Sequence, residues 1–232
     1  MKFALIGHPV EHSFSAQYLN SRFKSEGIDA HYELIDLPDI SEFQTLIKSG
    51  KYNGFNVTIP HKRAIIPYLD SLSPEATAIG AVNVIQITNN KLIGHNTDII
   101  GFHETLTPLL KPYHTHAVIL GTGGASQAVQ YVLHKLNIPF RLVTHKELDT
   151  NTITQLAPII INTTPLGMHP NTDTAPNIDY TQLADKHLIY DLVYNPTETR
   201  FLQLAKHQGA TTQNGLAMLH SQADAALKIW LK

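Results

Sequence analysis

The polar residues most suggestive of chemistry follow a short β-type stretch in the first half of the chain. Residues 54–62 read Gly-Phe-Asn-Val-Thr-Ile-Pro-His-Lys, which places Asn56, Thr58 and Lys62 close together. If the stretch is a strand, these side chains lie near its carboxyl end, where open α/β sheets bind ligands. A lysine ammonium can bind an anion or donate a proton to a reacting oxygen. Taken alone, the same residues also fit a solvated turn before a helix that starts at Pro60.

A glycine-rich turn in the second half points to a nucleotide. The apolar stretch 116–120 runs directly into Gly121, Gly123, Gly124, Ala125 and Ser126, and an amphipathic pattern follows to about residue 136. Glycines after a strand allow a tight turn and a close approach of the backbone to a pyrophosphate, which binds at the helix N-terminus. The strand before and the helix after favour a dinucleotide site over a purely structural turn.

Residues after the next apolar stretch, 139–143, bear on the choice of cofactor. A site for NAD usually has an acidic residue at this point, about twenty residues beyond the glycines. Thr144, His145 and Lys146 stand there instead, and a hydroxyl with two basic groups suits the 2′-phosphate of NADP better. Glu147 and Asp149 lie nearby and weaken this preference.

Composition excludes several classes of function. The chain has 232 residues, 43% of them hydrophobic, and a formal net charge of -2, so it can bury a core and has no basic footprint for nucleic acid. It has no cysteine, which excludes disulfides and thiolate metal sites and suits a reducing compartment. No stretch approaches the ~20 apolar residues of a membrane span. We expect a cytoplasmic protein that binds neither nucleic acid nor membrane.

These groups are positioned by alternating strands and helices, which predict a mostly parallel α/β architecture. In the first half we expect strands at 2–6, 31–37 and 54–59, helices at 15–24, 38–47 and from Pro60, a hairpin of strands 81–88 and 91–94 around Asn89-Asn90, and a helix from Asp98 to about 110. In the second half we expect strands at 116–120, 139–143, 158–162 and 188–193, a helix after the glycines and another at 216–231. The connection 144–157 is close to the minimum for a parallel crossover, so this sheet has a shortened edge.

Together the motifs resemble the shikimate dehydrogenase family. They are His-Ser-Phe-Ser at 12–15, Asn-Val-Thr-Ile-Pro-His-Lys at 56–62, Gly-Ala-Val-Asn at 80–83, Gly-His-Asn-Thr-Asp at 94–98, the glycine turn, and the segments 162–168, 191–196 with Thr199, and 214–219 with Gln222. The resemblance implies reduction of 3-dehydroshikimate to shikimate with NADPH in aromatic amino acid (chorismate) biosynthesis. It also implies two domains: an N-terminal α/β substrate domain, residues 1–99 completed by helix 216–232, and a Rossmann-type NAD(P)-binding domain, residues 100–215, here shortened.

The resemblance assigns roles to individual residues. Lys62 and Asp98 resemble the catalytic pair, with the lysine as proton donor to the alkoxide that hydride transfer leaves. The expected substrate-binding residues are Ser13, Ser15, Thr58 and Tyr194 for the carboxylate, and Asn83, Asp98 and Gln222 for the ring hydroxyls. Ser13 also fits a helix cap and Asp98 the N-terminal charge of a helix.

The cofactor is expected to be NADP(H). Its site comprises the glycine turn and Thr144 to Lys146, and the resemblance adds Thr163, Leu192, Gly215 and Met218. The family usually carries an arginine where Thr144, His145 and Lys146 stand, and a missing guanidinium removes a bidentate grip on the 2′-phosphate. We therefore predict weak discrimination between NADPH and NADH, so that NAD(H) is a possible cofactor.

The alternatives are a quinate or dual quinate/shikimate dehydrogenase and, from a different class, a catalytically idle small-molecule-binding regulator. The sequence has 14 histidines, but pairs such as His8 with His12 have no third ligand at a suitable spacing, so we expect no metal. A small-molecule substrate is the expected partner, and the chain is expected to be a monomer or homodimer.

Overall fold

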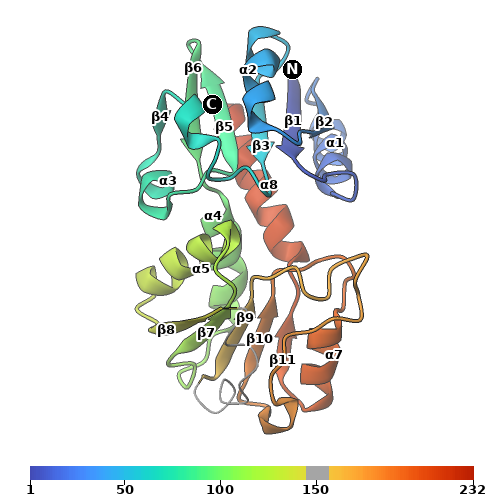
Figure 1. Cartoon of the computed structure of the whole chain (residues 1–232), viewed down its shortest axis with the longest axis vertical. Helices are drawn as coiled ribbons and strands as arrows, with labels where there is room; N and C mark the ends of the chain where they lie inside the picture. Colours follow the sequence, from blue (N-terminus) through green and yellow to red (C-terminus); the bar gives the residue numbers. More distant parts are fainter. Residues whose placement is uncertain (145–156) are drawn as a thin grey trace. The chain divides into compact units, whose positions relative to one another are not determined.

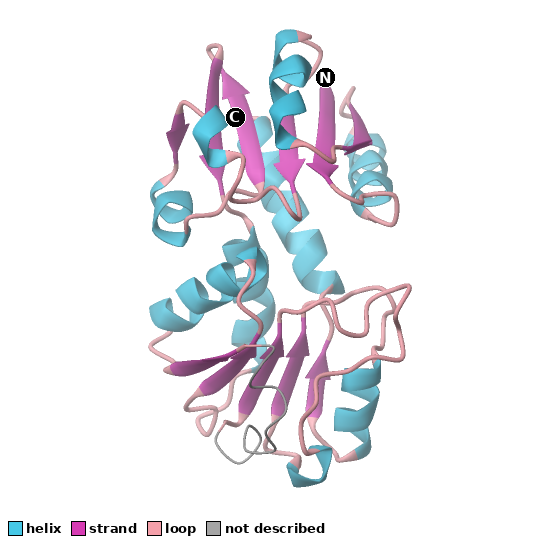
Figure 2. Cartoon of the chain, viewed as in Figure 1, coloured by secondary structure: helices cyan, strands magenta, loops and turns pink. Residues whose placement is uncertain are grey.

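The computed structural model describes residues 1–144 and 157–232. These residues form two compact units, the first made of Met1–Asp98 with His220–Lys232 and the second of Ile99–Leu219. The sequence-based division at 99/100 and 215/216 differs from this by a few residues at each boundary. Figures 1 and 2 show the elements of both units.

The first unit is built on a mixed sheet with the strand order β2-β1-β3-β5-β6-β4. β1, β2 and β3 are mutually parallel, whereas β5 is antiparallel to both β3 and β6, and β4 is parallel to β6. Their bounds are β1 Lys2–Gly7, β2 His31–Asp36, β3 Gly54–Val57, β4 Ser71–Leu72, β5 Val84–Thr88 and β6 Lys91–His95.

The predicted hairpin between β5 and β6 is confirmed. Asn89 and Asn90 have φ angles of 50° and 58°, the left-handed region that a tight two-residue hairpin turn requires and that asparagine tolerates. The turn brings His95 back beside Val84, so the end of β6 lies at the start of β5. The residues that follow β6 therefore lie at the same edge of the sheet as the end of β3.

Helices cover both faces of this sheet. On one face α1 (Ser15–Glu26) and the end of α8 (Leu216–Trp230) pack through Leu19, Phe23 and Leu227 on Phe3 and Leu5 of β1. The other face is covered by η1 (Ile40–Glu42), α2 (Phe43–Lys48), η2 (Ile66–Tyr68) and α3 (Pro74–Ile79). The sheet is thus buried on both sides, and its strand ends remain for ligands.

The helix predicted to start at Pro60 is wrong. Residues 59–65 form turns, and the first helical segment there is the short η2. The His61 carbonyl accepts from the Ile65 amide at 2.9 Å, which makes a single helical turn. Pro67 lacks the N–H that would continue such a helix, and its ring would clash with the Arg63 carbonyl, so proline fits only the first turn of η2.

The second unit has a parallel sheet with the order β11-β10-β9-β7-β8 over the described residues. Its strands are β7 Ala117–Leu120, β8 Phe140–Val143, β9 Ile159–Asn162, β10 Leu188–Asp191 and β11 Thr211–Gln213. Counted from β7, this is the strand order 2-1-4-5-6 of a Rossmann fold in which the third strand is absent from the described part of the chain. β8 is therefore the edge strand there, as the short connection 144–157 predicts.

Helices also cover both faces of the second sheet. α4 (Asp98–Leu106), η3 (Thr107–Leu109), α5 (Gly124–Lys135) and the start of α8 pack on one face through Phe102, Leu106, Val129 and Met218. η4 (Tyr180–Gln182) and α7 (Arg200–His207) pack on the other, where Phe201 and Leu202 are buried. Among the described residues, no helix has the length and apolar character needed to cross a bilayer.

Candidate active site

In the first unit, the polar residues predicted to act on substrate converge at one edge of the sheet. Thr58 follows β3, Asn83 precedes β5, and Thr97 and Asp98 follow β6. Because β5 is antiparallel to both of its neighbours, its start lies beside the ends of β3 and β6. The topology explains how residues far apart in sequence come to share one small volume.

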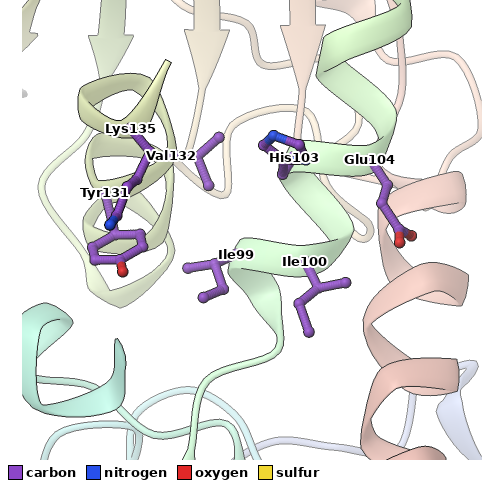
Figure 3. Close-up of a pocket in the computed structure, with 7 residues that line it drawn as sticks. All are labelled: Ile99, Ile100, His103, Glu104, Tyr131, Val132 and Lys135. Carbon is purple, nitrogen blue, oxygen red and sulfur yellow. The ribbon is translucent and has the colours of Figure 1, made fainter. Parts of the chain in front are cut away.

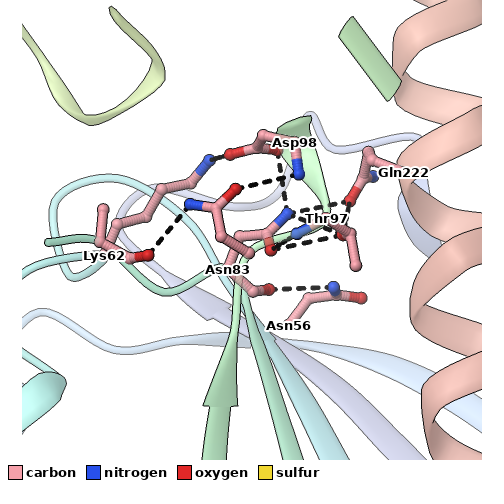
Figure 4. A network of polar contacts seen from close by, with 8 residues as sticks. Asn56, Lys62, Asn83, Thr97, Asp98 and Gln222 are labelled. Carbon is pink, nitrogen blue, oxygen red and sulfur yellow. Dashed lines mark hydrogen bonds and ion pairs between the residues drawn. The ribbon is translucent and has the colours of Figure 1, made fainter. Parts of the chain in front are cut away.

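Lys62 and Asp98 form an ion pair in this volume (Figure 4). The ammonium donates to Asp98 Oδ2 at 2.6 Å, and the two side chains are only 15% and 9% exposed. The backbone also holds the turn that carries the lysine, because the Val82 amide donates to the Lys62 carbonyl at 2.8 Å. A charged pair so little exposed to water has a fixed direction, which is what a positioned proton donor requires.

Asn83 is the centre of the network around this pair. Its Nδ2 contacts Asp98 Oδ1 at 2.9 Å, Thr97 Oγ1 at 3.1 Å and Gln222 Oε1 at 3.3 Å. Its Oδ1 accepts from the Thr97 amide at 2.7 Å. An amide nitrogen has two hydrogens, so it can donate to only two of these three oxygens at a time.

Two residues of the network differ from the sequence-based interpretation. Asn56 is buried: it accepts from the Tyr32 hydroxyl at 2.7 Å and donates to the Asn83 carbonyl at 3.1 Å, so it braces the sheet. Thr97 received no role from its sequence, yet its buried hydroxyl contacts both Asn83 and Gln222. The available signal was its position between Asn96 and Asp98, where the Asn96 side chain accepts from the Asp98 backbone amide at 3.1 Å.

The serine pair and Thr58 lie by the end of β1. Ser13 donates through its hydroxyl to Ser15 Oγ at 3.2 Å, and the Ser15 amide donates to Ser13 Oγ at 3.3 Å. The Thr58 methyl group packs directly over Gly7, and the Thr58 amide donates to the Ile6 carbonyl at 2.9 Å. Three hydroxyl groups are therefore placed around the carboxyl ends of β1 and β3.

The last helix brings Gln222 to this unit. Trp230 of α8 stacks on Phe3 with ring centroids 4.6 Å apart, and its indole N–H donates to the Ile85 carbonyl at 3.1 Å. Gly54 makes room for this ring, since a Cβ there would lie 2.5 Å from the indole nitrogen. Further contacts join Tyr18 to Asp224 at 2.9 Å and to His220 by stacking. α8 is thus attached to the first unit along its second half.

In the second unit, the glycine turn has the features of an anion site. Gly121 has a φ of 104°, and a Cβ there would lie 2.8 Å from Thr163 Oγ1. A Cβ on Gly123 would meet no atom within 4 Å, so there is open space for a ligand over the turn. Gly123 precedes α5, whose N-terminus has no side-chain cap and no acidic residue in its first turn. Uncapped amides with a positive helix end fit the phosphates of a dinucleotide.

The other predicted cofactor residues line the carboxyl edge of the same sheet. Thr163 donates to the Leu120 carbonyl at 2.7 Å, which holds it beside Gly121, and Thr144 follows the neighbouring strand β8. The Leu192 amide donates to the Asn162 carbonyl at 3.0 Å, and the Gly215 amide to the Val193 carbonyl at 3.1 Å. His145 and Lys146 lie outside the described residues.

Three predicted site residues differ from this arrangement. The side chains of Ser126 and Met218 are packed inside the second unit, and Tyr194 belongs to a different unit from the other residues predicted to bind the substrate carboxylate. Ser126 is fully buried and accepts from Gln130 Nε2 at 3.1 Å, which suits the small residue needed for close helix packing. Met218 packs in the apolar core of the second unit. Tyr194 belongs to the second unit, three residues after β10, and is half-buried.

The second unit also has a separate hollow between α4 and α5. It has a volume of about 220 Å³ and is lined by Ile99, Ile100, His103, Glu104, Tyr131, Val132 and Lys135. Figure 3 shows these side chains on the two helices. None of them is a predicted site residue. Within residues 1–144 and 157–232, no cluster of three histidine or acidic side chains is placed to hold a metal ion.

Comparison with known proteins identifies the class and then the family. The model of the shikimate dehydrogenase substrate binding domain matches residues 5–85. Shikimate dehydrogenase (NADP(+)) of Staphylococcus haemolyticus is 38% identical over 249 residues, which cover 99% of this chain and 92% of the relative. That alignment is longer than the 232-residue chain, so this chain lacks residues that the relative has.

Solved structures of related enzymes are similar to this chain over nearly its whole length. Shikimate 5-dehydrogenase of Thermus thermophilus, in complex with NADP(H) and shikimate, superposes with a TM-score of 0.88 at 32% identity and covers 99% of this chain and 93% of its own. A 5-ketofructose reductase of Gluconobacter is also similar, with 28% identity and a TM-score of 0.82 over 100% of this chain and 92% of its own.

The Rossmann-type sheet and the buried Lys62–Asp98 pair define an oxidoreductase that acts on a CH–OH group. The sequence similarity to shikimate dehydrogenases, which extends over nearly the whole chain, identifies the family within this class. The chain belongs to the shikimate dehydrogenase family.

Proposed function

We propose that the chain catalyses the reversible reduction of 3-dehydroshikimate to shikimate with NADPH. The observation that carries the proposal is the Lys62–Asp98 ion pair of 2.6 Å, held by Asn83 and Thr97 at the open edge of the first sheet, in a member of this family. The ketone substrate and the alcohol product differ by one hydride and one proton. The pair is suited to handle the proton.

In the proposed reaction, Lys62 is the acid. When bound, the nicotinamide dinucleotide supplies the hydride that forms the new C–H bond. The ketone oxygen gains negative charge as that bond forms, and the ammonium of Lys62 stabilises the charge and gives a proton from Nζ. The resulting neutral amine regains a proton from solvent. Asp98 keeps the ammonium directed through its Oδ2 contact and is itself directed by Asn83 through Oδ1.

Substrate recognition is proposed to divide between hydroxyls and amides. The hydroxyls of Ser13, Ser15 and Thr58 donate to the substrate carboxylate without burying another full charge. Asn83, Asp98 and Gln222 hold the ring hydroxyls, since amides both donate and accept. Tyr194 is assigned to the carboxylate only by its motif.

The cofactor is proposed to lie along the carboxyl edge of the second sheet. The turn of Gly121, Gly123, Gly124 and Ala125 would hold the pyrophosphate at the start of α5, with Thr163, Leu192 and Gly215 beside the rest of the dinucleotide. Thr144, with His145 and Lys146 outside the described residues, is assigned to the adenosine end. NADP(H) is the proposed cofactor, and NAD(H) is proposed to bind comparably.

We also propose where the chain acts and in which oligomeric state. The absence of cysteine supports action in the cytoplasm. The working state is a monomer or homodimer, which size-exclusion chromatography with light scattering would distinguish.

An assay of purified chain tests the activity. NADPH or NADH is combined with 3-dehydroshikimate, 3-dehydroquinate or 5-ketofructose, and oxidation of the reduced cofactor is followed by absorbance. We expect turnover with 3-dehydroshikimate. Preference for 3-dehydroquinate would instead support a quinate dehydrogenase, and binding of shikimate without any turnover would support an idle binding protein.

Lys62→Ala tests the role of the lysine. We expect kcat to fall by at least about 10²-fold, because proton transfer by a positioned group contributes about 10²–10⁴-fold. The dissociation constant for NADPH should stay within about twofold of wild type, since the lysine lies in the other unit. The matched control is Lys51→Ala, an exposed lysine of the same unit. Unchanged turnover in Lys62→Ala would refute the assignment.

A further inference from the structure

Asp191 is a fully buried carboxylate that the proposed chemistry does not use. It is the last residue of β10, and its partner across the ladder is Asn162, the last residue of β9. Burial raises the pKa of the Asp191 carboxyl to about 6. A buried acid of this kind is retained only where hydrogen bonds compensate for lost hydration.

The Asp191 carboxylate joins three separate segments. Its Oδ1 accepts from the side-chain Nδ2 of Asn162 and from the backbone N–H of Val193, both at 3.0 Å. Its Oδ2 accepts from the Thr199 hydroxyl at 2.6 Å. The donors come from the end of β9, the turn after β10 and the N-cap of α7, where Thr199 also accepts from the Leu202 amide at 3.4 Å.

The hydrogen bonds continue into the turns that carry the proposed cofactor residues. Asn162 Oδ1 accepts from the Thr164 amide at 3.0 Å and from its hydroxyl at 2.6 Å, which fixes the turn that contains Thr163. The Asp191 bond to Val193 fixes the turn that contains Leu192, and the Val193 carbonyl then accepts from Gly215 at 3.1 Å. The hydrogen bonds of one buried carboxylate therefore fix both turns from the interior of the unit.

We propose that Asp191 is a positioning residue for the cofactor, and that it sets the turns after β9 and β10 in the geometry that the dinucleotide binds. The inference rests on the proposed function, because it assigns the dinucleotide to this edge. With no exposed surface, Asp191 acts through Thr163 and Leu192 and not by contact. The competing role is purely structural, in which the cluster stabilises the second unit without affecting its ligand.

Two substitutions at Asp191 separate geometry from charge. Asp191→Ala removes the acceptor of three buried donors, and we expect the dissociation constant for NADPH to rise at least about tenfold, since each unsatisfied buried donor is costly. Asp191→Asn keeps an oxygen for Asn162 and Val193, and its amide can donate to Thr199 Oγ1. We therefore expect Asp191→Asn to bind NADPH within about threefold of wild type. The KM for 3-dehydroshikimate should change less than about twofold in both variants.

The matched control is Tyr190→Phe, one residue earlier in the same strand. It removes a partly buried hydrogen bond of 2.5 Å to Thr105 and keeps the ring that packs on Phe102. That bond joins β10 to α4 and does not involve the turns after β9 and β10. We expect a loss of thermal stability similar in kind to that of Asp191→Ala, with the NADPH dissociation constant within about twofold of wild type.

The experiment is a fluorescence titration with NADPH of each folded variant, alongside steady-state kinetics. Weak binding by Asp191→Ala together with recovery in Asp191→Asn and normal binding by Tyr190→Phe supports the proposal. Equal loss in Asp191→Ala and Tyr190→Phe, or less than twofold loss in Asp191→Ala, overturns it. If Asp191→Ala does not fold, Thr199→Val replaces it: a rise of several-fold supports the proposal and a rise below twofold overturns it.

The titration also distinguishes this inference from the proposed function. A wild-type chain that binds neither NADPH nor NADH would overturn both. A wild-type chain that binds and turns over, with Asp191→Ala binding equally well, would overturn the role of Asp191 alone.

Discussion

The ammonium of Lys62 and the amide of Asn83 donate to different oxygens of the Asp98 carboxylate. Two donors therefore fix the orientation of the Asp98 carboxylate, one at each oxygen. A neutral side chain of the same shape cannot accept a hydrogen bond from both. Removing one partner of an ion pair this little exposed leaves a poorly compensated charge and costs about 3–5 kcal/mol. The pair is a more sensitive point of the chain than any surface ion pair, such as Lys206 with Glu198.

We expect Asp98→Asn to impair catalysis more than the binding of NADPH. The amide has a single acceptor oxygen, so its NH₂ group must face either Lys62 or Asn83, both of which are donors. We expect kcat to fall by about 10²-fold or more, with the NADPH dissociation constant within about twofold. Steady-state kinetics with both substrates checks this. Asp39→Asn is the control, because asparagine caps a helix as well as aspartate does.

The choice between NADPH and NADH is a second question at the scale of residues. No arginine lies among residues 144–149, the segment proposed to bind the adenosine end of the cofactor, whereas a guanidinium is the side chain that binds a phosphate in bidentate fashion. We expect dissociation constants for NADPH and NADH that differ by less than about tenfold, measured by titration under the same salt conditions. A strong preference for NADPH with tight binding would contradict this expectation.

Among the elements, those with local signals were predictable from the sequence. The periodic stretches predicted β1, β7, α1 and α5, the two asparagines predicted the hairpin, and the glycine turn predicted the strand-to-helix connection. The helix from Pro60 was mispredicted because Pro67 limits it, a signal that was present but not weighed. The motif residues Lys62, Asp98, Asn83 and Gln222 were expected together, and the structure brings them together.

What the sequence did not reveal depends on strand pairing. Asn162 and Asp191 become neighbours only because β9 and β10 end at the same register. Likewise, Asn56 braces the sheet only because β3 lies between β1 and β5, within reach of Tyr32 on β2. Such partners are separated by tens of residues, and neither propensity nor periodicity carries that information.

The Asp191 cluster gives a prediction on stability and pH. The pKa of Asp191 is raised to about 6 in the folded chain, against about 3.9 when unfolded, so the folded state binds an extra proton between these values. The wild-type free energy of unfolding therefore gains from this group as pH falls through 6, and loses that gain as pH rises. We expect Asp191→Asn to exceed wild type by about 2 kcal/mol at pH 7.5 and to match it near pH 4. Urea denaturation at both pH values checks this, and a difference independent of pH would contradict it.

At the scale of the whole molecule, α8 belongs to both units: it begins in the second and ends in the first. Gln222 reaches Asn83 at 3.3 Å only if the helix is held on the first sheet, and Trp230 is its largest anchor there. The position of Gln222, which is proposed to hold a ring hydroxyl of the substrate, is thus linked to packing at the far end of the same helix.

Trp230→Ala tests this link. It removes the stack on Phe3 and leaves the Ile85 carbonyl without its donor, a change that costs about 3 kcal/mol or more for a large aromatic side chain. We expect lower thermal stability and a KM for 3-dehydroshikimate raised several-fold, with NADPH binding nearly unchanged. Leu231→Ala, at an exposed neighbouring position, should leave all three properties unaltered. Equal effects on both ligands would argue against the link.

The return of α8 to the first sheet also has a consequence for synthesis of the protein. A ribosome completes Ile99–Leu219, a continuous stretch with its own cores, before it makes His220–Lys232. Until then, Phe3, Leu19 and Phe23 lack their partners Ala223, Leu227 and Trp230, and the part of this face of the first sheet that α1 does not cover stays exposed. The unit translated first is therefore the last to be completed, and it is the unit that carries Lys62 and Asp98.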